Sequence, residues 1–469
     1  MTVVHDRPLD RHDAPDVVAS GDTRDHDFGD AVPTRATALP SWPVTALLAA
    51  YPIWWALGLG VLIFPLLAVP MVYLLVRQRR RVTLPPGFGL WLLFLAIVVI
   101  STAALGANPA GTVPGTVGGR LVGVGYRFVS YLALTVLLVY LGNVDRARLP
   151  QHRLVRLLAW LFVVTVAGGL LGVFAGRFEF NSAIELLLPH HWRENSFVRS
   201  LVHPASAQVM DLLGAERPRP AAPWGYTNTW GNNVCLLVVW FVVWALAGRR
   251  SRRLFGLACL AVAVVPVVHS LNRGLWIGLG VIVGYVALRL ARHGRVAALC
   301  AVGVAATLLA GALVFTPLGG IVDQRLNNGR SNGVRMYLTD RSLQGLSESP
   351  LIGFGSTRST QGGRNSITVG ESANCKRCGN FTVGGNGQLW QLLFAHGLLG
   401  TAAYLGFLLY GLWRFRTDTS PIGLAAGAAI VSTFAAMLWY NALVTPLAFT
   451  FCAFALLWRN AEVRQVAAR

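Results

Sequence analysis

Arginines gather in the polar segments that separate long apolar runs in the second half of this sequence. Arg219 and Arg273 each lie shortly before an apolar run, and Arg325 and Arg335 lie in the polar segment 317–387. A guanidinium group is charged at neutral pH and binds phosphate oxygens through two parallel hydrogen bonds. These four positions therefore predict a site for a phosphate-containing anion, with all four arginines as its diphosphate-binding residues.

Membrane-spanning helices are the elements that must position these arginines. Hydrophobic residues make up 54% of the sequence and charged residues 13%, and the mean hydropathy is +0.54. An apolar run of about 17–25 residues crosses a bilayer as a helix, and the sequence contains about twelve such runs. We therefore expect an all-α fold, a polytopic transmembrane helical bundle of about twelve spans. The expected spans are about 43–58, 59–76, 87–105, 121–142, 157–176, 228–247, 254–270, 274–291, 296–316, 388–413, 422–440 and 442–458. Prolines interrupt the first pair, which could instead be one span plus a re-entrant segment.

Positive charge is distributed unevenly over the connections between these spans. The net charge is +20 at pH 7, and arginines concentrate at 77–81, 146–156, 249–253, 289–295 and 414–416. Cytoplasmic loops carry the excess of Arg and Lys in membrane proteins, so these connections and both termini are predicted to be cytoplasmic. A basic soluble protein would suggest nucleic acid. Here the charge lies in short connections, which favours membrane lipids as partners and no nucleic acid.

The same topology divides the chain into a membrane domain, 42–458, and two tails. Residues 1–41 are polar and predict a disordered cytoplasmic tail, and 459–469 a cytoplasmic C-terminal tail. Two long loops, about 177–227 and 317–387, are predicted to be extracytoplasmic and partly helical, with a helix over 331–346. Heavy use of Arg, Ala, Gly and Val with Lys376 as the single lysine favours a bacterial source, and hence the bacterial plasma membrane.

Acidic and amide side chains in the outer loops are the remaining candidates for chemistry. Neither loop contains an Asp-x-Asp motif or a tight carboxylate cluster, so we expect no metal and no other cofactor. Glu348 and Asn386 are the catalytic candidates besides Arg273 and Arg335. Asn386 can orient a hydroxyl but cannot take its proton, and Glu371 and His269 are further base candidates. His396 lies well inside an apolar run and is expected to be a hydrogen-bonded core residue.

Cys375 and Cys378 form a Cys-Lys-Arg-Cys motif in the second outer loop. No second Cys-x-x-Cys and no nearby histidine completes a zinc site. On the oxidising side of the membrane the pair predicts a local disulfide, with plain thiols or a redox-active pair as the alternatives.

Four stretches resemble the O-antigen ligase and O-antigen polymerase family of polytopic membrane glycosyltransferases. Ser270–Trp276 is similar to the family's Ser-Arg-Gly segment at the start of a span. The stretch from Arg335 to Gly355 is similar to its arginine-rich helix and Pro-Leu-Ile-Gly-x-Gly turn. The stretch 389–400 resembles its Leu-Gln…Gly-Leu-Leu-Gly span, and Arg219 with 225–228 resembles its Arg…Gly-x-x-x-Asn entry to a span. The resemblance covers about 220–400.

The resemblance implies a glycosyltransferase, a ligase or a polymerase, that works on the outer face of the membrane. Its donor is a glycan on a polyprenyl diphosphate, and a hydroxyl of a glycan or lipid acceptor attacks with inversion. One position departs from the family, which usually has His-Asn where this chain has Asn386-Gly387. Either another group acts as the base, or base catalysis is dispensable, or the activity has diverged.

Two other classes of function remain compatible with the sequence. A transporter or flippase for a lipid-linked glycan would also be polytopic and basic, although transporter sites usually lie near the bilayer midplane. An inactive scaffold in an envelope-assembly complex would account for the substituted histidine position.

Overall fold

The computed structural model describes residues 39–79, 82–211, 216–314, 318–327, 330–360 and 381–467. The two predicted cysteines of the outer loop, Cys375 and Cys378, lie outside these residues, as does most of the predicted N-terminal tail. Residues 39–469 form one unit, and its described part is mainly helical with almost no sheet. The predicted all-α class is therefore confirmed.

The helices are α1 (Trp42–Ala49), α2 (Tyr51–Ala56), α3 (Ile63–Arg77), α4 (Phe88–Ile100), α5 (Val117–Asn143), α6 (Gln151–Phe174), α7 (Ala183–Leu187), α8 (His190–Arg193), α9 (Ser196–Val202), α10 (Thr227–Leu246), α11 (Arg250–His269), α12 (Arg273–Arg292), α13 (Val296–Val314), α14 (Leu318–Asn327), α15 (Arg330–Glu348), α16 (Gln388–Arg414), α17 (Pro421–Ala436) and α18 (Thr445–Ala467). Strand β1 (Ala207–Asp211) pairs antiparallel with β2 (Glu216–Pro220), and β3 (Arg358–Ser359) with β4 (Thr382–Val383).

Six of the described helices, α5, α6, α10, α11, α12 and α16, are long and apolar enough to cross a membrane. Helices α3, α4, α13 and α17 are apolar but present shorter stretches. The first predicted span, 43–58, is divided into α1 and α2 at Ala50. The chain is therefore consistent with a helical membrane protein, and the number of about twelve spans stays a prediction.

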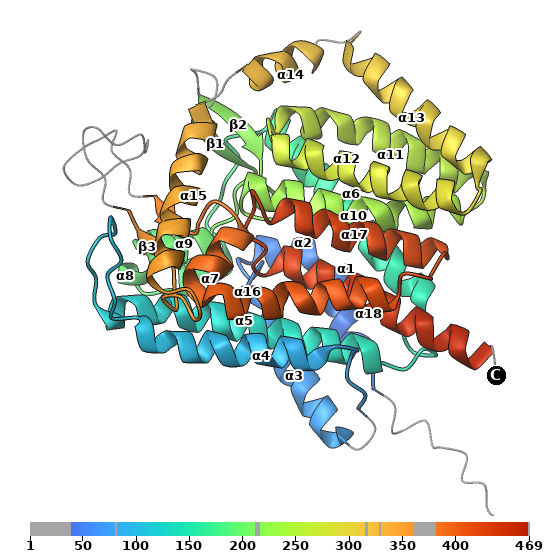
Figure 1. Cartoon of the computed structure of the whole chain (residues 1–469). Coiled ribbons are helices and arrows are strands. Elements are labelled where there is room, and N and C mark those ends of the chain that lie inside the picture. The colour runs from blue at the N-terminus through green and yellow to red at the C-terminus, as the bar shows by residue number, and fades with distance from the viewer. Residues whose placement is uncertain are drawn as a thin grey trace, which may run out of the picture. The chain divides into compact units, whose positions relative to one another are not determined.

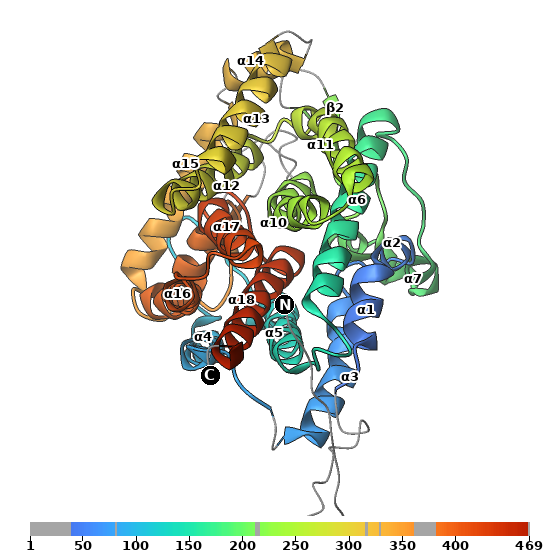
Figure 2. The same cartoon turned by 90° about the vertical axis from the view of Figure 1, so that its right-hand side faces the viewer.

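Helix α10 lies at the centre of the packing. It contacts α6, α11, α12, α17 and α18, and Figure 2 shows α10 between α6, α11 and α17. Trp230, Trp240 and Phe241 of α10 are fully buried. Large aromatic side chains fill the space between these helices and hold them in one arrangement.

The arginine-rich connections meet at one end of the helices. Arg459 is buried in α18 and donates hydrogen bonds to three carbonyl oxygens in the connection 141–149, at 2.7–2.8 Å. Arg289 donates to the carbonyl oxygens of Arg416 and Asp418 at 2.5 and 2.8 Å. Helix α18 thus continues through residues that we expected to begin a C-terminal tail, because Arg459 is held against the α5–α6 connection.

The two long loops gather at the opposite end. Figure 1 shows α7, α8, α9, α15 and β3 on the left, near the ends at which α5 and α16 begin, and the C-terminus on the right. Both loops contain helices, as predicted, and α15 matches the helix predicted over 331–346. The pairing of β1 with β2 was not predicted.

A break in α16 determines how the second loop attaches to the bundle. Gly397 has φ 60° and ψ −164° and interrupts the helix. The turn 350–355 donates two backbone hydrogen bonds to carbonyl oxygens just before Gly397, at 3.0 and 2.8 Å, and accepts two from amides just after it, at 2.8 and 3.2 Å. The polar groups freed by the break are therefore paired with the turn, as buried backbone groups require.

Candidate functional site

Arg219 enters the site from the paired strands at the end of α6. It lies in β2 opposite Gln208 of β1, and its side chain is 6% exposed. Its Nε donates a hydrogen bond to the carbonyl oxygen of Ser270 at 2.6 Å. The first outer loop is thereby attached to the connection between α11 and α12.

Asn272 shapes that connection. Its side-chain oxygen accepts a hydrogen bond from the amide of Leu275 at 3.4 Å and caps the start of α12. Its Nδ2 donates to the carbonyl oxygen of Thr227 at 3.3 Å, at the start of α10. Arg273 is therefore the first residue of α12, and its Nη2 donates to Oδ1 of Asn332 at 2.6 Å.

The second outer loop supplies the other two predicted arginines. Arg325 in α14 is 5% exposed and its Nε donates to the carbonyl oxygen of Leu271 at 3.0 Å. Arg335 lies in α15, which packs against α16, and its side chain is half-buried.

These four arginines lie close enough to act on one another electrostatically. Burial lowers the pKa of Arg219 to about 10, with Arg325 and Arg335 adding to the effect. Burial also lowers the pKa of Arg325 to about 10, with contributions from Arg273 and Arg335. The pKa of Arg335 is lowered by burial and by Arg273. Four predicted residues from β2, α12, α14 and α15 therefore form one group, which we call the arginine cluster.

Tyr440 is a member of this site that the sequence analysis missed. It is 2% exposed, and its hydroxyl donates a hydrogen bond to Oδ1 of Asn272. Its carbonyl oxygen accepts a hydrogen bond from the amide of Gln388 at 2.8 Å. Tyr440 interacts electrostatically with Arg219, Arg325 and Arg335. A polar aromatic residue between two apolar runs was the only sequence signal that could have indicated it.

Asn386 borders the arginine cluster through α15. Its Nδ2 donates hydrogen bonds to Oγ1 of Thr339 at 2.9 Å and to the carbonyl oxygen of Arg335 at 3.3 Å. Its Oδ1 is buried and has no hydrogen-bond partner among the described residues. A buried amide oxygen without a partner can accept a hydrogen bond from a ligand hydroxyl.

The predicted carboxylate and histidine candidates are not shown to join the arginine cluster. Glu348 ends α15, about 20 Å along the helix from Arg335 at about 1.5 Å per residue. It is exposed, and its Oε1 accepts a hydrogen bond from the amide of Ala110 at 3.4 Å, so it lies apart from the arginine cluster. Nδ1 of His269 lies 2.9 Å from the carbonyl oxygen of Val265. Glu371 lies outside the described residues.

His396 and Arg358 have structural partners. His396 is 2% exposed, its Nδ1 lies 3.1 Å from Oγ of Ser101, and its ring packs edge-to-face on Phe94. This confirms the expected core role. Arg358 is 3% exposed and donates to backbone carbonyls of 104–107 and 354–357 at 2.9–3.4 Å. It fastens the second loop to the end of α4.

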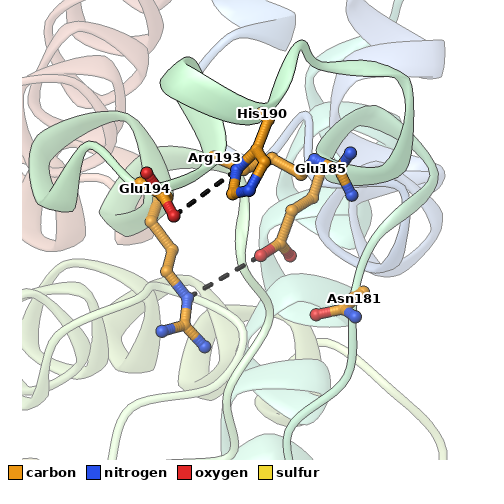
Figure 3. Close-up of a pocket in the computed structure, with 6 residues that line it drawn as sticks. Asn181, Glu185, His190, Arg193 and Glu194 are labelled. Atoms are coloured by element: carbon orange, nitrogen blue, oxygen red, sulfur yellow. Dashed lines mark ion pairs between the residues drawn. The ribbon is translucent and has the colours of Figure 1, made fainter.

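A second polar group lies in the first outer loop (Figure 3). A cavity of about 380 Å³ there is lined by Asn181, Glu185, His190, Arg193, Glu194 and Arg199. Arg199 lies 3.7 Å from the carboxylate of Glu185, and Nδ1 of His190 lies 3.5 Å from the carboxylate of Glu194. Glu185 also lies 2.7 Å from Nδ1 of His203. Because Arg199 faces a carboxylate, this cavity is poorly suited to a multiply charged anion.

Neither the known protein-family models nor the curated proteins match this chain. Within the described residues, no group of three or more His, Cys, Asp or Glu side chains is placed to hold a metal ion. The chemistry of the site therefore has to be argued from the arginine cluster, Tyr440 and Asn386.

Proposed function

We propose that this chain is a membrane glycosyltransferase, a ligase or a polymerase, that uses a glycan on a polyprenyl diphosphate as its donor. The observation that carries the proposal is the convergence of Arg219, Arg273, Arg325 and Arg335. They come from three parts of the sequence, since Arg325 and Arg335 belong to the same outer loop, and they meet at one end of apolar helices. A lipid-linked diphosphate presents its charge at that boundary.

The physical argument rests on the cost of gathering like charges. Each guanidinium opposes the protonation of its neighbours, and partial burial adds to this cost. A bound diphosphate offsets both effects because its oxygens accept charge-assisted hydrogen bonds from several arginines at once. The same contacts stabilise the extra negative charge that a departing diphosphate acquires.

The reaction we propose needs no metal in the site. An acceptor hydroxyl attacks the anomeric carbon of the donor sugar, and the bond between that carbon and the diphosphate oxygen breaks. The arginine cluster binds the departing diphosphate, and the acceptor proton passes to water at the exposed face. Asn386 orients the acceptor hydroxyl through its Oδ1, which has no hydrogen-bond partner among the described residues. Attack from the face opposite the leaving group inverts the configuration.

The proposed location is the outer face of a bacterial plasma membrane, with both termini in the cytoplasm. Support comes from the two ends of the helices. At one end, Arg289 of α12 is bonded to the connection after α16, and Arg459 of α18 to the connection between α5 and α6, which suits the cytoplasmic side. The arginine cluster belongs to the opposite end, where α12 and α16 begin.

The test is release of free polyprenyl diphosphate by purified protein in liposomes that contain a polyprenyl-diphosphate glycan, with EDTA present. We expect Arg273→Ala and Arg335→Ala each to lower the rate by about 10²–10³, the usual effect of losing one preorganised donor. Lysine at either position should restore part of the rate, because it supplies charge without the guanidinium fork. Arg414→Ala, an exposed arginine at the other end of α16, is the control and should leave the rate unchanged.

Near-normal rates in both alanine variants would refute the proposed centre. A flippase for the same donor would give a different result in the same liposomes. It would move the donor between leaflets without releasing polyprenyl diphosphate, and its products would contain no elongated or transferred glycan.

A further inference from the structure

The connection between α11 and α12 holds three members of the arginine cluster. Arg219 donates from Nε to the carbonyl oxygen of Ser270 at 2.6 Å, and Arg325 donates from Nε to the carbonyl oxygen of Leu271 at 3.0 Å. Arg273 lies two residues further along, at the start of α12. Side chains from β2 and α14 are therefore attached to the same short stretch of backbone that leads into Arg273, and its conformation sets how the three guanidinium groups lie relative to one another.

This connection has an unusual backbone. Leu271 has φ 52°, a left-handed conformation that is rare for a large side chain, and the residue is 2% exposed. Such a conformation persists only where the surrounding contacts hold it, and it occurs most often at functional sites. The contacts that hold this connection in place therefore bear on the arrangement of the arginines.

Asn272 and Tyr440 supply those contacts. Asn272 is 3% exposed, and its Oδ1 accepts hydrogen bonds from the amide of Leu275 and from the hydroxyl of Tyr440. Its Nδ2 donates to the carbonyl oxygen of Thr227 at 3.3 Å, and Thr227 in turn donates from Oγ1 to the carbonyl oxygen of Arg219 at 3.3 Å. The side chain of Asn272 therefore connects Tyr440 both with α12 and with the strand that carries Arg219.

Tyr440 is itself held in place by α16, α17 and α12. Its carbonyl oxygen accepts a hydrogen bond from the amide of Gln388 at 2.8 Å, and its amide donates to the carbonyl oxygen of Ala436 at 2.8 Å. Its ring lies against α12 at Gly274, where a Cβ would lie 2.7 Å from the ring carbon that bears the hydroxyl. The close approach that brings the hydroxyl to Asn272 thus depends on a glycine at position 274.

We propose that Tyr440 is a positioning residue of the diphosphate site. Through its hydrogen bond to Asn272 it fixes the connection between α11 and α12, and thereby the spacing of the three guanidinium groups attached there. Two linked phosphoryl groups need several correctly spaced guanidinium groups, whereas a single phosphoryl group needs fewer of them. This inference rests on the proposed function, because it takes the arginine cluster as the diphosphate site.

The test is calorimetric titration of the full chain in detergent with inorganic diphosphate and, separately, with inorganic phosphate. We expect Tyr440→Phe to weaken the binding of diphosphate by about tenfold and that of phosphate by about threefold or less. In this variant Oδ1 of Asn272 keeps its hydrogen bond from the amide of Leu275. A misfolded fraction would lower the number of sites and leave the dissociation constant unchanged, so the two measured quantities separate a positioning role from a merely structural one.

A second variant, Gly274→Ala, perturbs the same contact from α12. Its Cβ should push the ring of Tyr440 away from Asn272 and lower the preference for diphosphate over phosphate in the same way, although alanine is favoured over glycine within a helix. Gly280→Ala is the control for this variant, because a Cβ at this position of α12 meets no atom within 4 Å. Tyr140→Phe is the control for loss of a buried hydroxyl: Tyr140 is 0% exposed and donates to a backbone carbonyl oxygen at 2.6 Å near the end of α5. Both controls should keep the affinity of the parent.

Arg335→Ala separates failure of this inference from failure of the proposed function. If Arg335→Ala loses diphosphate binding while Tyr440→Phe and Gly274→Ala keep the parental dissociation constants, the cluster binds diphosphate and the positioning role of Tyr440 is overturned. If none of the three variants changes the dissociation constant, the arginine cluster is not the diphosphate site, and the proposed function and the positioning role are both wrong.

Discussion

Replacement of Gly397 by alanine tests how α16 is joined to the second outer loop. The residue has φ 60° and ψ −164°, a region of the backbone map that is essentially reserved for glycine. Forcing alanine into such a conformation costs about 1–3 kcal/mol. The added Cβ would also lie 2.4 Å from the carbonyl carbon and oxygen of Leu351 and 2.7 Å from the amide nitrogen of Ile352.

The contact with Leu351 cannot be relieved by a side-chain rotation, because it is made with backbone atoms. The turn 350–355 would have to move away from the break and lose part of its four backbone hydrogen bonds. Each such bond contributes about 1 kcal/mol. Together with the strain, we expect Gly397→Ala to lower the free energy of unfolding by about 3 kcal/mol or more.

The assay is thermal unfolding in detergent, followed by tryptophan fluorescence. Gly284→Ala is the control: Gly284 lies inside α12, and a Cβ there meets no atom within 4 Å. Alanine is favoured over glycine in a helix by about 1 kcal/mol, so this variant should unfold at the same temperature as the parent or higher. Equal thermal unfolding midpoints for Gly397→Ala and the parent would show that the backbone hydrogen bonds between the turn 350–355 and the break in α16 do not stabilise the fold as described.

Three further predictions concern charge, packing and topology. Burial and like charges lower the pKa of Arg219 and Arg325 to about 10, so both are charged below that pH and lose charge above it. Titration calorimetry with inorganic diphosphate should therefore give a constant affinity near neutral pH and weaker binding as the pH rises through about 10. An affinity for diphosphate that stays unchanged up to about pH 12 would contradict the role of these arginines. Arg358→Ala should lower the unfolding midpoint, because it leaves several buried carbonyl oxygens unpaired at a cost of about 1–3 kcal/mol each; an unchanged midpoint would show that these hydrogen bonds contribute nothing. After reduction, a membrane-impermeant thiol reagent should label Cys375 or Cys378 in intact cells, and labelling only after permeabilisation would reverse the proposed topology.

Local sequence patterns were sufficient to predict most of the helices. Apolar runs predicted the helices that became α5, α6, α10 and α16, because a helix in a bilayer satisfies its own backbone hydrogen bonds. The polar stretch 331–346 was predicted as a helix and corresponds to α15. The predicted span 388–413 corresponds to α16, which is interrupted at Gly397.

The sequence was less informative where structure depends on a distant partner. The pairing of β1 with β2 was missed because the segment Glu216–Pro220 alternates charges with prolines, which lack an amide hydrogen and are disfavoured in strands. The division of the first predicted span at Ala50 and the continuation of α18 past Arg459 depend on neighbouring helices.

The sequence by itself determined the helical membrane class, the uneven distribution of arginines and the set of arginines to consider. Only the tertiary structure brought Arg219, Arg273, Arg325 and Arg335 into one group and left Glu348 apart from it. Hydropathy depends on each residue and its near neighbours, whereas this convergence depends on how α10, α12 and α16 pack and on where Tyr440 meets Asn272. Contacts between residues so far apart in the chain arise from side-chain packing across several helices, which no local pattern encodes.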